Sequence, residues 1–201
     1  MIGKDKKQFA PACDRNQTYI DKVLSRALPE QTTVLEIGSG TGQHASYFAS
    51  RHPGWIWQPA DLPEQHASIR AWKAESGAAN ILVPIDLDLV NSDWSVDSVD
   101  AVVCINTIHI VSWAMVENLF HGVGHVLTAG GVFYVYGPYR YHDQPLAPSN
   151  EQFDCWLQAR DPQSGIRDFE AVNTLAQQAG LLLECDEAMP ANNRSIWWRK
   201  T

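Results

Sequence analysis

The chain has 201 residues, of which 45% are hydrophobic and 19% charged, and its formal net charge at pH 7 is −8. This size and apolar content fit a single domain over residues 1–201 with a substantial core. The acidic balance argues against duplex nucleic acid as a partner. Phosphate contacts require clustered basic residues, and the chain has only the short run Lys4-Asp5-Lys6-Lys7. A small-molecule substrate stays open, and composition does not decide the oligomeric state.

Cysteine usage and hydropathy bear on the compartment. The four cysteines are far apart and form no Cys-x-x-Cys pair, and Cys104 and Cys185 lie in apolar, strand-like stretches. This pattern favours buried thiols in a reducing compartment over a disulfide framework. The sequence has no signal-peptide pattern and no apolar run long enough for a membrane span. We therefore expect a cytoplasmic protein without a membrane partner.

The first predicted helix spans about residues 14–28. Pro11 is expected to end a polar leader, and Asp14 with Gln17 resembles a capping box at the helix start. Apolar residues then recur at helical spacing before Pro29: Ile20, Val23, Leu24, Ala27 and Leu28. The polar pair Arg15-Asn16 precedes this stripe, and a solvated helix terminus is its simplest interpretation.

A glycine-rich turn follows the first predicted strand. Val34 to Ile37 are apolar around Glu36, and glycines at 38, 40 and 42 precede a helical stripe. Such a turn lets the backbone approach a ligand closely, although a flexible loop without function has the same composition. Dinucleotide enzymes usually show Gly-x-Gly-x-x-Gly, and here the third glycine comes one residue early. An unpaired carboxylate in the strand is costly unless a cationic or donor-rich ligand covers Glu36.

Two further acidic positions end the next predicted strands. Asp61 follows the strand Trp55–Ala60 at the distance where α/β folds place a carboxylate for ribose hydroxyls. The alternative is that it caps the helix that begins near Pro63; we favour the ribose contact, and both roles can coexist. Asp86 follows the strand Ile81–Ile85 and could accept a hydrogen bond from an adenine amino group; ordinary turn chemistry is the alternative. We favour Asp86 over Asp88 because it stands at the strand end.

The fourth predicted strand, residues 99–105, is almost wholly apolar, as expected for a central parallel strand, and it leads into Asn106. Ser112 is expected to cap a helix that reaches Leu127 before Gly130-Gly131. His121 and His125 stand four apart on that helix. Because no third ligand is in register, we expect solvated histidines and no metal site.

The fifth predicted strand, residues 132–136, precedes a long loop to about Ser149 whose tyrosines could form an aromatic lid or simply pack. Asp168 is expected to cap a helix that ends at Gly180. Residues 181–185 and 195–198 are the last two predicted strands, joined through Met189-Pro190-Ala191-Asn192-Asn193.

Strands alternating with helices predict an α/β fold in which helices cover both faces of a mostly parallel sheet. Ligands bind such sheets beyond the carboxyl ends of the strands. If the sixth strand is parallel and the seventh returns antiparallel, Asn192 and Asn193 turn over that same edge and face a pocket. A simple Asn-rich turn is the alternative.

The chain resembles class I S-adenosylmethionine-dependent methyltransferases, and more closely the family called methyltransferase-like protein 26 in animals and domain of unknown function 938 in bacteria. The pieces that carry the resemblance are Pro11-Ala12-Cys13-Asp14-Arg15-Asn16, Leu35-Glu36-Ile37-Gly38-Ser39-Gly40-Thr41-Gly42-Gln43-His44, Trp57-Gln58-Pro59, Ile105-Asn106-Thr107-Ile108-His109-Ile110, Tyr136-Gly137-Pro138, Ser149-Asn150, Phe153-Asp154, Gly165-Ile166-Arg167-Asp168 and Met189-Pro190-Ala191-Asn192-Asn193. The Arg-Asn, Gln-His and Pro-Ala-Asn-Asn pieces are the more specific ones. Asp14 departs from the family's usual Glu, which leaves a capping role intact.

The resemblance implies a Rossmann-like three-layer sandwich with strand order 3-2-1-4-5-7-6, the last strand antiparallel, and S-adenosylmethionine as cofactor. The cofactor-binding residues that it suggests, by position, are Glu36, Gly38, Ser39, Gly40 and Gly42 for the methionine part, Asp61 with Leu62 for the ribose, Asp86 with Leu87 for the adenine, and Asn106 near the sulfonium. As our own inference, Arg15 pairs with the cofactor carboxylate, so the first helix would cover the site.

The acceptor is not implied. His109 and Tyr139 are the catalytic candidates, with His109 either a base or a buried histidine bonded to backbone. The substrate-side candidates are Tyr139, Asn150, Asn192 and Asn193. The leading hypothesis is methyl transfer to a small molecule. A catalytically silent, cofactor-binding regulatory protein is the alternative, and an NAD-dependent oxidoreductase is disfavoured by the glycine spacing.

Overall fold

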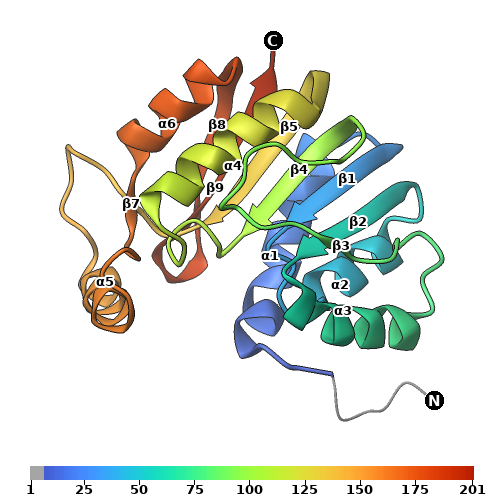
Figure 1. Cartoon of the computed structure of the whole chain (residues 1–201). Coiled ribbons are helices and arrows are strands. Elements are labelled where there is room, and N and C mark those ends of the chain that lie inside the picture. The colour runs from blue at the N-terminus through green and yellow to red at the C-terminus, as the bar shows by residue number, and fades with distance from the viewer. Residues whose placement is uncertain (1–6) are drawn as a thin grey trace.

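The computed structural model describes residues 7–201, so Lys4-Asp5-Lys6 of the short basic run lie outside it. Its centre is a seven-stranded sheet in the order β3-β2-β1-β4-β5-β9-β8 (Figure 1). The strands are β1 (Thr32–Ile37), β2 (Trp55–Asp61), β3 (Ile85–Asp86), β4 (Val99–Ile105), β5 (Leu127–Gly137), β8 (Leu181–Met189) and β9 (Asn193–Lys200). The first five pair in parallel, and β9 is antiparallel to both neighbours. The predicted order and the antiparallel last strand are confirmed.

Helices cover both faces of the sheet (Figure 1). They are α1 (Pro11–Ala27), α2 (Gln43–Arg51), α3 (Pro63–Ser76), α4 (Trp113–Val126), α5 (Pro148–Arg160) and α6 (Phe169–Gln178). Helices α1 and α2 share one core with the sheet, and α4 and α6 share the other. Figure 1 shows α5 outside these two layers, beyond one edge of the sheet. Two short strands, β6 (Tyr139–Arg140) and β7 (Arg167–Asp168), form a separate parallel pair nearby.

The two cores explain why β4 is so apolar. Val102 and Cys104 face the core under α4 and α6, while Ala101 and Val103 face the core under α1 and α2. A strand buried on both faces gains transfer free energy from every side chain, so no polar alternation is expected. Within residues 7–201, no helix combines the length and hydropathy that crossing a bilayer would require.

The first helix begins earlier than predicted. Pro11 is its first residue rather than the end of a leader, and Ala10 is the N-cap. Proline suits this position because its fixed φ is helical and its missing N–H is not needed there. The side chain of Gln43 supplies the missing cap, since its Oε1 accepts from the Ala10 N–H at 2.5 Å. Asp14 instead accepts from Gln43 Nε2 at 3.3 Å, so the capping-box prediction was wrong.

Other element boundaries also differ from the prediction. The third strand has only Ile85–Asp86, with Ile81 in an isolated bridge to Trp57, because Pro84 cannot donate to a ladder. Helix α4 ends at Val126, and β5 begins at Leu127 rather than at 132. The caps at Ser112 and Asp168 are confirmed: each accepts from the backbone N–H three residues on, Met115 and Ala171. The N-cap of α3 is Leu62, so Asp61 does not have that role.

Candidate functional site

A cavity of about 490 Å³ lies beyond the carboxyl ends of β1, β2 and β4, and we call it the main cavity. The residues that line it are Gln8, Ala10, Ala12, Cys13, Ile37 to Thr41, His44, Asp61, Leu62, Gln65, Leu87 to Leu89, Ile105 to Thr107, Ile110, Val111 and Met115. The parallel sheet thus brings together segments far apart in the sequence. Of the predicted cofactor-binding residues, Gly38, Ser39, Gly40, Asp61, Leu62, Leu87 and Asn106 line it.

The three positions of the turn require glycine for different physical reasons. All three have positive φ: +72° at Gly38, +55° at Gly40 and +90° at Gly42. A Cβ at Gly38 would lie 2.5 Å from Thr107 Oγ1, and one at Gly42 would lie 2.7 Å from Ile69 Cα. These two glycines therefore allow close packing of the chain on itself. Only Gly40 has open space at its Cβ position, so it is the one at which a ligand can approach the bare backbone.

Asp61 holds the turn in place. Its Oδ2 accepts from the Gly40 N–H at 2.6 Å, and its Oδ1 accepts from the Leu62 N–H at 2.7 Å. Burial raises the pKa of this carboxyl above its usual value, while the two backbone donors favour the charged form. The carboxylate therefore shapes the turn and also lines the cavity.

Glu36 lies behind the turn and is not among the residues that line the main cavity. It is 2% exposed, and its Oε2 accepts from the Trp57 indole N–H at 3.1 Å. Burial raises the pKa of Glu36 to about 7. The chain thus supplies an internal donor for this carboxyl, so no ligand is needed to cover it, contrary to the reasoning from sequence.

Two predicted cofactor contacts lie elsewhere. Asp86 is exposed and lines a neighbouring cavity of about 280 Å³, whereas Asp88 lines the main cavity. The preference for Asp86 is therefore not supported, because the chain continues past the short β3 before it reaches the cavity. Arg15 is exposed on α1 and does not line the cavity. The helix reaches the site through Ala12 and Cys13 instead.

The structure adds a buried group that sequence reasoning missed. His44 Nε2 lies 2.8 Å from Asn16 Oδ1, and His44 Nδ1 lies 3.7 Å from Cys13 Sγ. Both His44 and Cys13 line the main cavity. Burial lowers the pKa of His44 to about 4 and raises the pKa of Cys13 to about 11. The Arg-Asn and Gln-His motifs carried the signal, but their separation of 28 residues hides the contact.

A second cavity, of about 200 Å³, is lined by all four substrate-side candidates, Tyr139, Asn150, Asn192 and Asn193. Tyr139 is 4% exposed, and its hydroxyl has no hydrogen-bond partner among residues 7–201. It is packed in the core, so it does not form an exposed lid. Asn150 is buried and donates to the Asn192 carbonyl at 3.0 Å. Ala191 and Asn192 both have φ of +57°, a left-handed backbone that is uncommon for residues other than glycine.

His109 is buried and lines neither cavity, although its chain neighbours Thr107 and Ile110 line the main cavity. Its ring packs edge-on against Phe153 with ring centroids 5.5 Å apart. Its Nδ1 has no hydrogen-bond partner in the described chain. Burial lowers the pKa of His109 to about 4, with Arg167 contributing in the same direction. Its Nδ1 is 3.3 Å from the position that a Cβ on Gly137 would take, and Asn106 Oδ1 is 3.9 Å from the same point.

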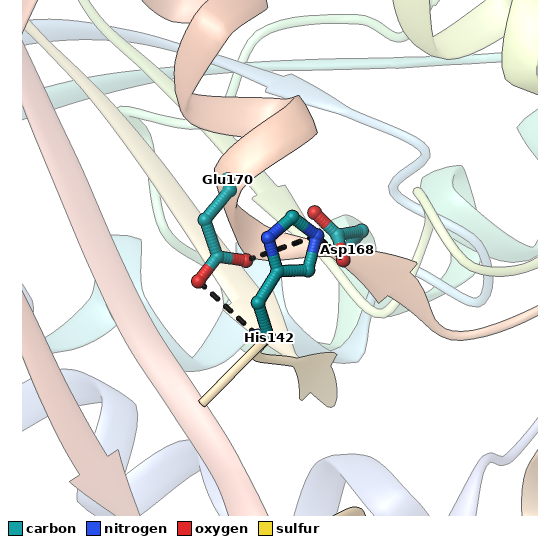
Figure 2. Close-up of side chains that lie close together, drawn as sticks. All are labelled: His142, Asp168 and Glu170. Carbon is teal, nitrogen blue, oxygen red and sulfur yellow. Dashed lines mark hydrogen bonds and ion pairs between the residues drawn. The ribbon is translucent and has the colours of Figure 1, made fainter. Parts of the chain in front are cut away.

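One imidazole and two carboxylates meet at the start of α6 (Figure 2). His142 Nε2 lies 2.7 Å from Asp168 Oδ2 and 3.9 Å from Glu170 Oε2, and the His142 N–H donates to Glu170 at 3.3 Å. Asp168 also caps α6. The His142 side chain is 68% exposed, so we interpret the cluster as a structural contact that joins the segment after β6 to the start of α6.

The pair His121 and His125 lies on α4, where His125 Nδ1 bonds to the His121 carbonyl oxygen.

A comparison with known protein families assigns the chain to one of them. The model of a family described as a protein of unknown function, DUF938, matches residues 7–200. The chain belongs to this family. Its predicted class I methyltransferase fold is likewise confirmed by solved structures that share it.

Three similar structures illustrate that fold. An O-methyltransferase family protein from Burkholderia thailandensis has a TM-score of 0.81 at 15% identity, over 94% of this chain and 57% of that one. Human N-acetylserotonin methyltransferase in complex with SAM gives 0.73 at 16%, over 92% and 54%. The calicheamicin-biosynthesis methyltransferase CalO1 in its SAH-bound form gives 0.75 at 19%, over 94% and 55%. This chain thus spans a little more than half the length of those chains.

The charged side chains that line the main cavity, among the described residues, are acidic. Asp61 and Asp88 line it, whereas no Lys or Arg does so in the part of the chain that the structure describes. A wall with carboxylates and no basic side chain favours a cationic ligand and gives no counter-charge for a pyrophosphate. The open backbone at Gly40 leaves room for the ligand.

Proposed function

We propose that this chain is an S-adenosylmethionine-dependent methyltransferase that acts on a small-molecule acceptor. The observation that carries the proposal is the main cavity, whose glycine turn is bonded to Asp61 and whose described lining has two carboxylates, Asp61 and Asp88, and no Lys or Arg. A nicotinamide dinucleotide carries phosphates, and this wall offers them no basic partner. The same fold in structures that hold SAM or SAH supports the choice of cofactor.

Different residues of the main cavity suit different parts of the cofactor. The first-turn N–H groups of α2 suit its carboxylate, because a helix N-terminus presents unpaired donors, whereas the Gly40 N–H already donates to Asp61. Asp61 is the candidate for the ribose hydroxyls. Asp88, with Leu87 and Leu89, offers a carboxylate and apolar surface to the adenine. Arg15 has no place in this proposal, since it is exposed.

The bound cofactor would supply an activated methyl group. The chain would bind the cofactor and the acceptor, orient them toward each other and exclude water from the site. On the acceptor side, the second cavity offers the amides of Asn150, Asn192 and Asn193 and the Tyr139 hydroxyl. His109 is the candidate base, because its neutral Nδ1 lacks a partner among residues 7–201 and faces the bare Gly137 backbone near Asn106. An amine that arrives neutral would not need this base.

Binding and turnover are tested separately. Calorimetry should show that SAH binds and NAD does not. Gly40→Val and Asp61→Ala should lose SAH binding and still unfold in a single cooperative thermal transition, at a somewhat lower temperature. Tritium transfer from labelled cofactor to a small-molecule extract then reports turnover. SAH binding without any transfer would favour the silent regulatory protein. Binding of NAD in preference to SAH would overturn the proposal.

A further inference from the structure

Asn16, His44 and Cys13 form a chain of contacts, of which His44 and Cys13 line the main cavity. Asn16 and His44 are buried, at 7% and 6% exposure, and they join α1 to the N-terminal turn of α2. The His44 ring also stacks on Phe48, with centroids 5.5 Å apart and planes at 4°. The ring is therefore fixed in position and orientation.

Two observations fix which ring nitrogen carries the proton. Asn16 presents Oδ1 to Nε2 at 2.8 Å, and an amide oxygen can only accept, so Nε2 donates. Cys13 is a protonated thiol, because its burial raises its pKa to about 11, and its S–H can donate toward Nδ1. The ring is neutral, so Nδ1 holds a lone pair.

The donor that Nδ1 now has is a weak one. A thiol is a poor hydrogen-bond donor, and the Cys13 Sγ to Nδ1 distance is 3.7 Å. Because His44 and Cys13 both line the cavity, a ligand with a stronger donor can take the place of the thiol. A lone pair repels a carboxylate, so this nitrogen selects a donor rather than an acceptor.

We propose that His44 Nδ1 accepts a hydrogen bond from the α-ammonium group of the bound nucleoside amino acid and so selects ligands that carry this group. The inference rests on the proposed function, and it gives His44 a binding role. It also gives a reason for the pairing of Asn16 with His44: Asn16 holds the ring in the tautomer that leaves Nδ1 free to accept. A charge-assisted bond of this kind is stronger than the S–H contact it replaces.

The test compares two ligands in four forms of the protein: the unmodified chain, two variants of His44 and one control variant. The ligands are SAH and its analogue in which hydrogen replaces the α-ammonium group. In His44→Gln, the longer amide keeps a group near Nε2 for Asn16 but places none at Nδ1. In His44→Asn, the shorter amide keeps an acceptor near Nδ1 and loses the bond to Asn16. Calorimetry gives both affinities in each form, and His121→Gln on the exposed face of α4 is the control.

We expect the unmodified chain to prefer SAH over the analogue, and His44→Gln to reduce this preference about tenfold, mostly by weakening SAH. His44→Asn should keep most of the preference. Equal weakening of both ligands by His44→Gln, or an unchanged preference, would overturn the inference while leaving SAH binding and the proposed function intact. Failure of SAH to bind the unmodified chain would overturn both.

A second measurement does not depend on the folding of a variant. In the unmodified chain labelled with ¹⁵N-histidine, SAH should shift the Nδ1 resonance of the His44 ring, and the deaminated analogue should not. Identical shifts with the two ligands would contradict a contact between Nδ1 and the ammonium group.

Discussion

At the residue scale, glycine is required for two separate reasons: a left-handed backbone conformation and a lack of space for a Cβ atom. Gly38 and Gly40 of the turn and Gly77, the C-cap of α3, all have positive φ, between +55° and +72°. A Cβ at Gly38 would clash with Thr107, whereas Gly40 and Gly77 have open space. The left-handed conformation costs a residue with a Cβ about 1 kcal/mol, and a forced contact in a packed site adds about 1–3 kcal/mol.

Three alanine substitutions therefore have different expected outcomes. Gly77→Ala should lower the free energy of unfolding by about 1 kcal/mol, and Gly38→Ala should lower it by about 2–4 kcal/mol. Gly40→Ala should cost as little stability as Gly77→Ala and yet weaken SAH binding. Urea unfolding and calorimetry measure the two effects. Equal stability of the Gly38 and Gly77 variants would show that the Thr107 contact relaxes freely.

Glu36 makes stability depend on pH. Burial raises its pKa from 4.5 to about 7 in the folded chain, so the folded state binds this proton more tightly than the unfolded state does. The resulting stabilisation is full below about pH 4.5 and is lost as the pH rises through 7. The total is about 3 kcal/mol. Glu36→Gln keeps an acceptor for Trp57 and removes the proton equilibrium.

We therefore expect Glu36→Gln to become more stable relative to the unmodified chain as the pH rises from 5 to 8. Urea unfolding at each pH gives this difference. Glu151→Gln, an exposed change on α5, should leave the difference flat. A flat result for Glu36→Gln as well would mean that the carboxyl keeps an ordinary pKa.

At the element scale, α1 is held against the turn by polar side chains as well as by its apolar face. Gln43 is 2% exposed; its Oε1 accepts from the Ala10 N–H and from Thr41 Oγ1, and its Nε2 donates to Asp14. One side chain of α2 thus caps α1 and ties it to the turn. Apolar burial of Ile20 and Leu24 supplies the rest.

Gln43→Ala should lower the free energy of unfolding by about 1–3 kcal/mol, because the partly buried Ala10 N–H loses its acceptor. Amide hydrogen exchange should become faster in the first turn of α1 and change little in α4. Gln152→Ala, an exposed change on α5, is the matched control. Unchanged exchange in α1 would show that its apolar face alone holds it.

At the scale of the whole molecule, the parallel sheet decides which residues meet. The turn after β1, Asp61 after β2 and Asn106 after β4 line one cavity because their strands end at one edge. The β8–β9 turn brings Asn192 and Asn193 to a second cavity with Asn150 of α5. The antiparallel β9 makes this possible, since its first residues pair with the last residues of β5.

Much of this arrangement followed from local pattern. The apolar run of β4, the caps at Ser112 and Asp168, and the glycine turn all use rules that act over a few residues, and the strand order followed from the family resemblance. The boundaries of α1 and β3 did not follow, because Pro11 was taken for a stop and Pro84 for a strand residue.

The sequence alone determined the α/β fold, the glycine turn and the acid at 61, because hydrophobic period and turn chemistry are written in neighbouring residues. Only the tertiary structure decided that Asp88 rather than Asp86 lines the main cavity, that Arg15 does not line it, and that Asn16 contacts the ring of His44. Those facts depend on where separate elements dock. Docking is set by the packing of whole faces, which spacing along the chain does not encode.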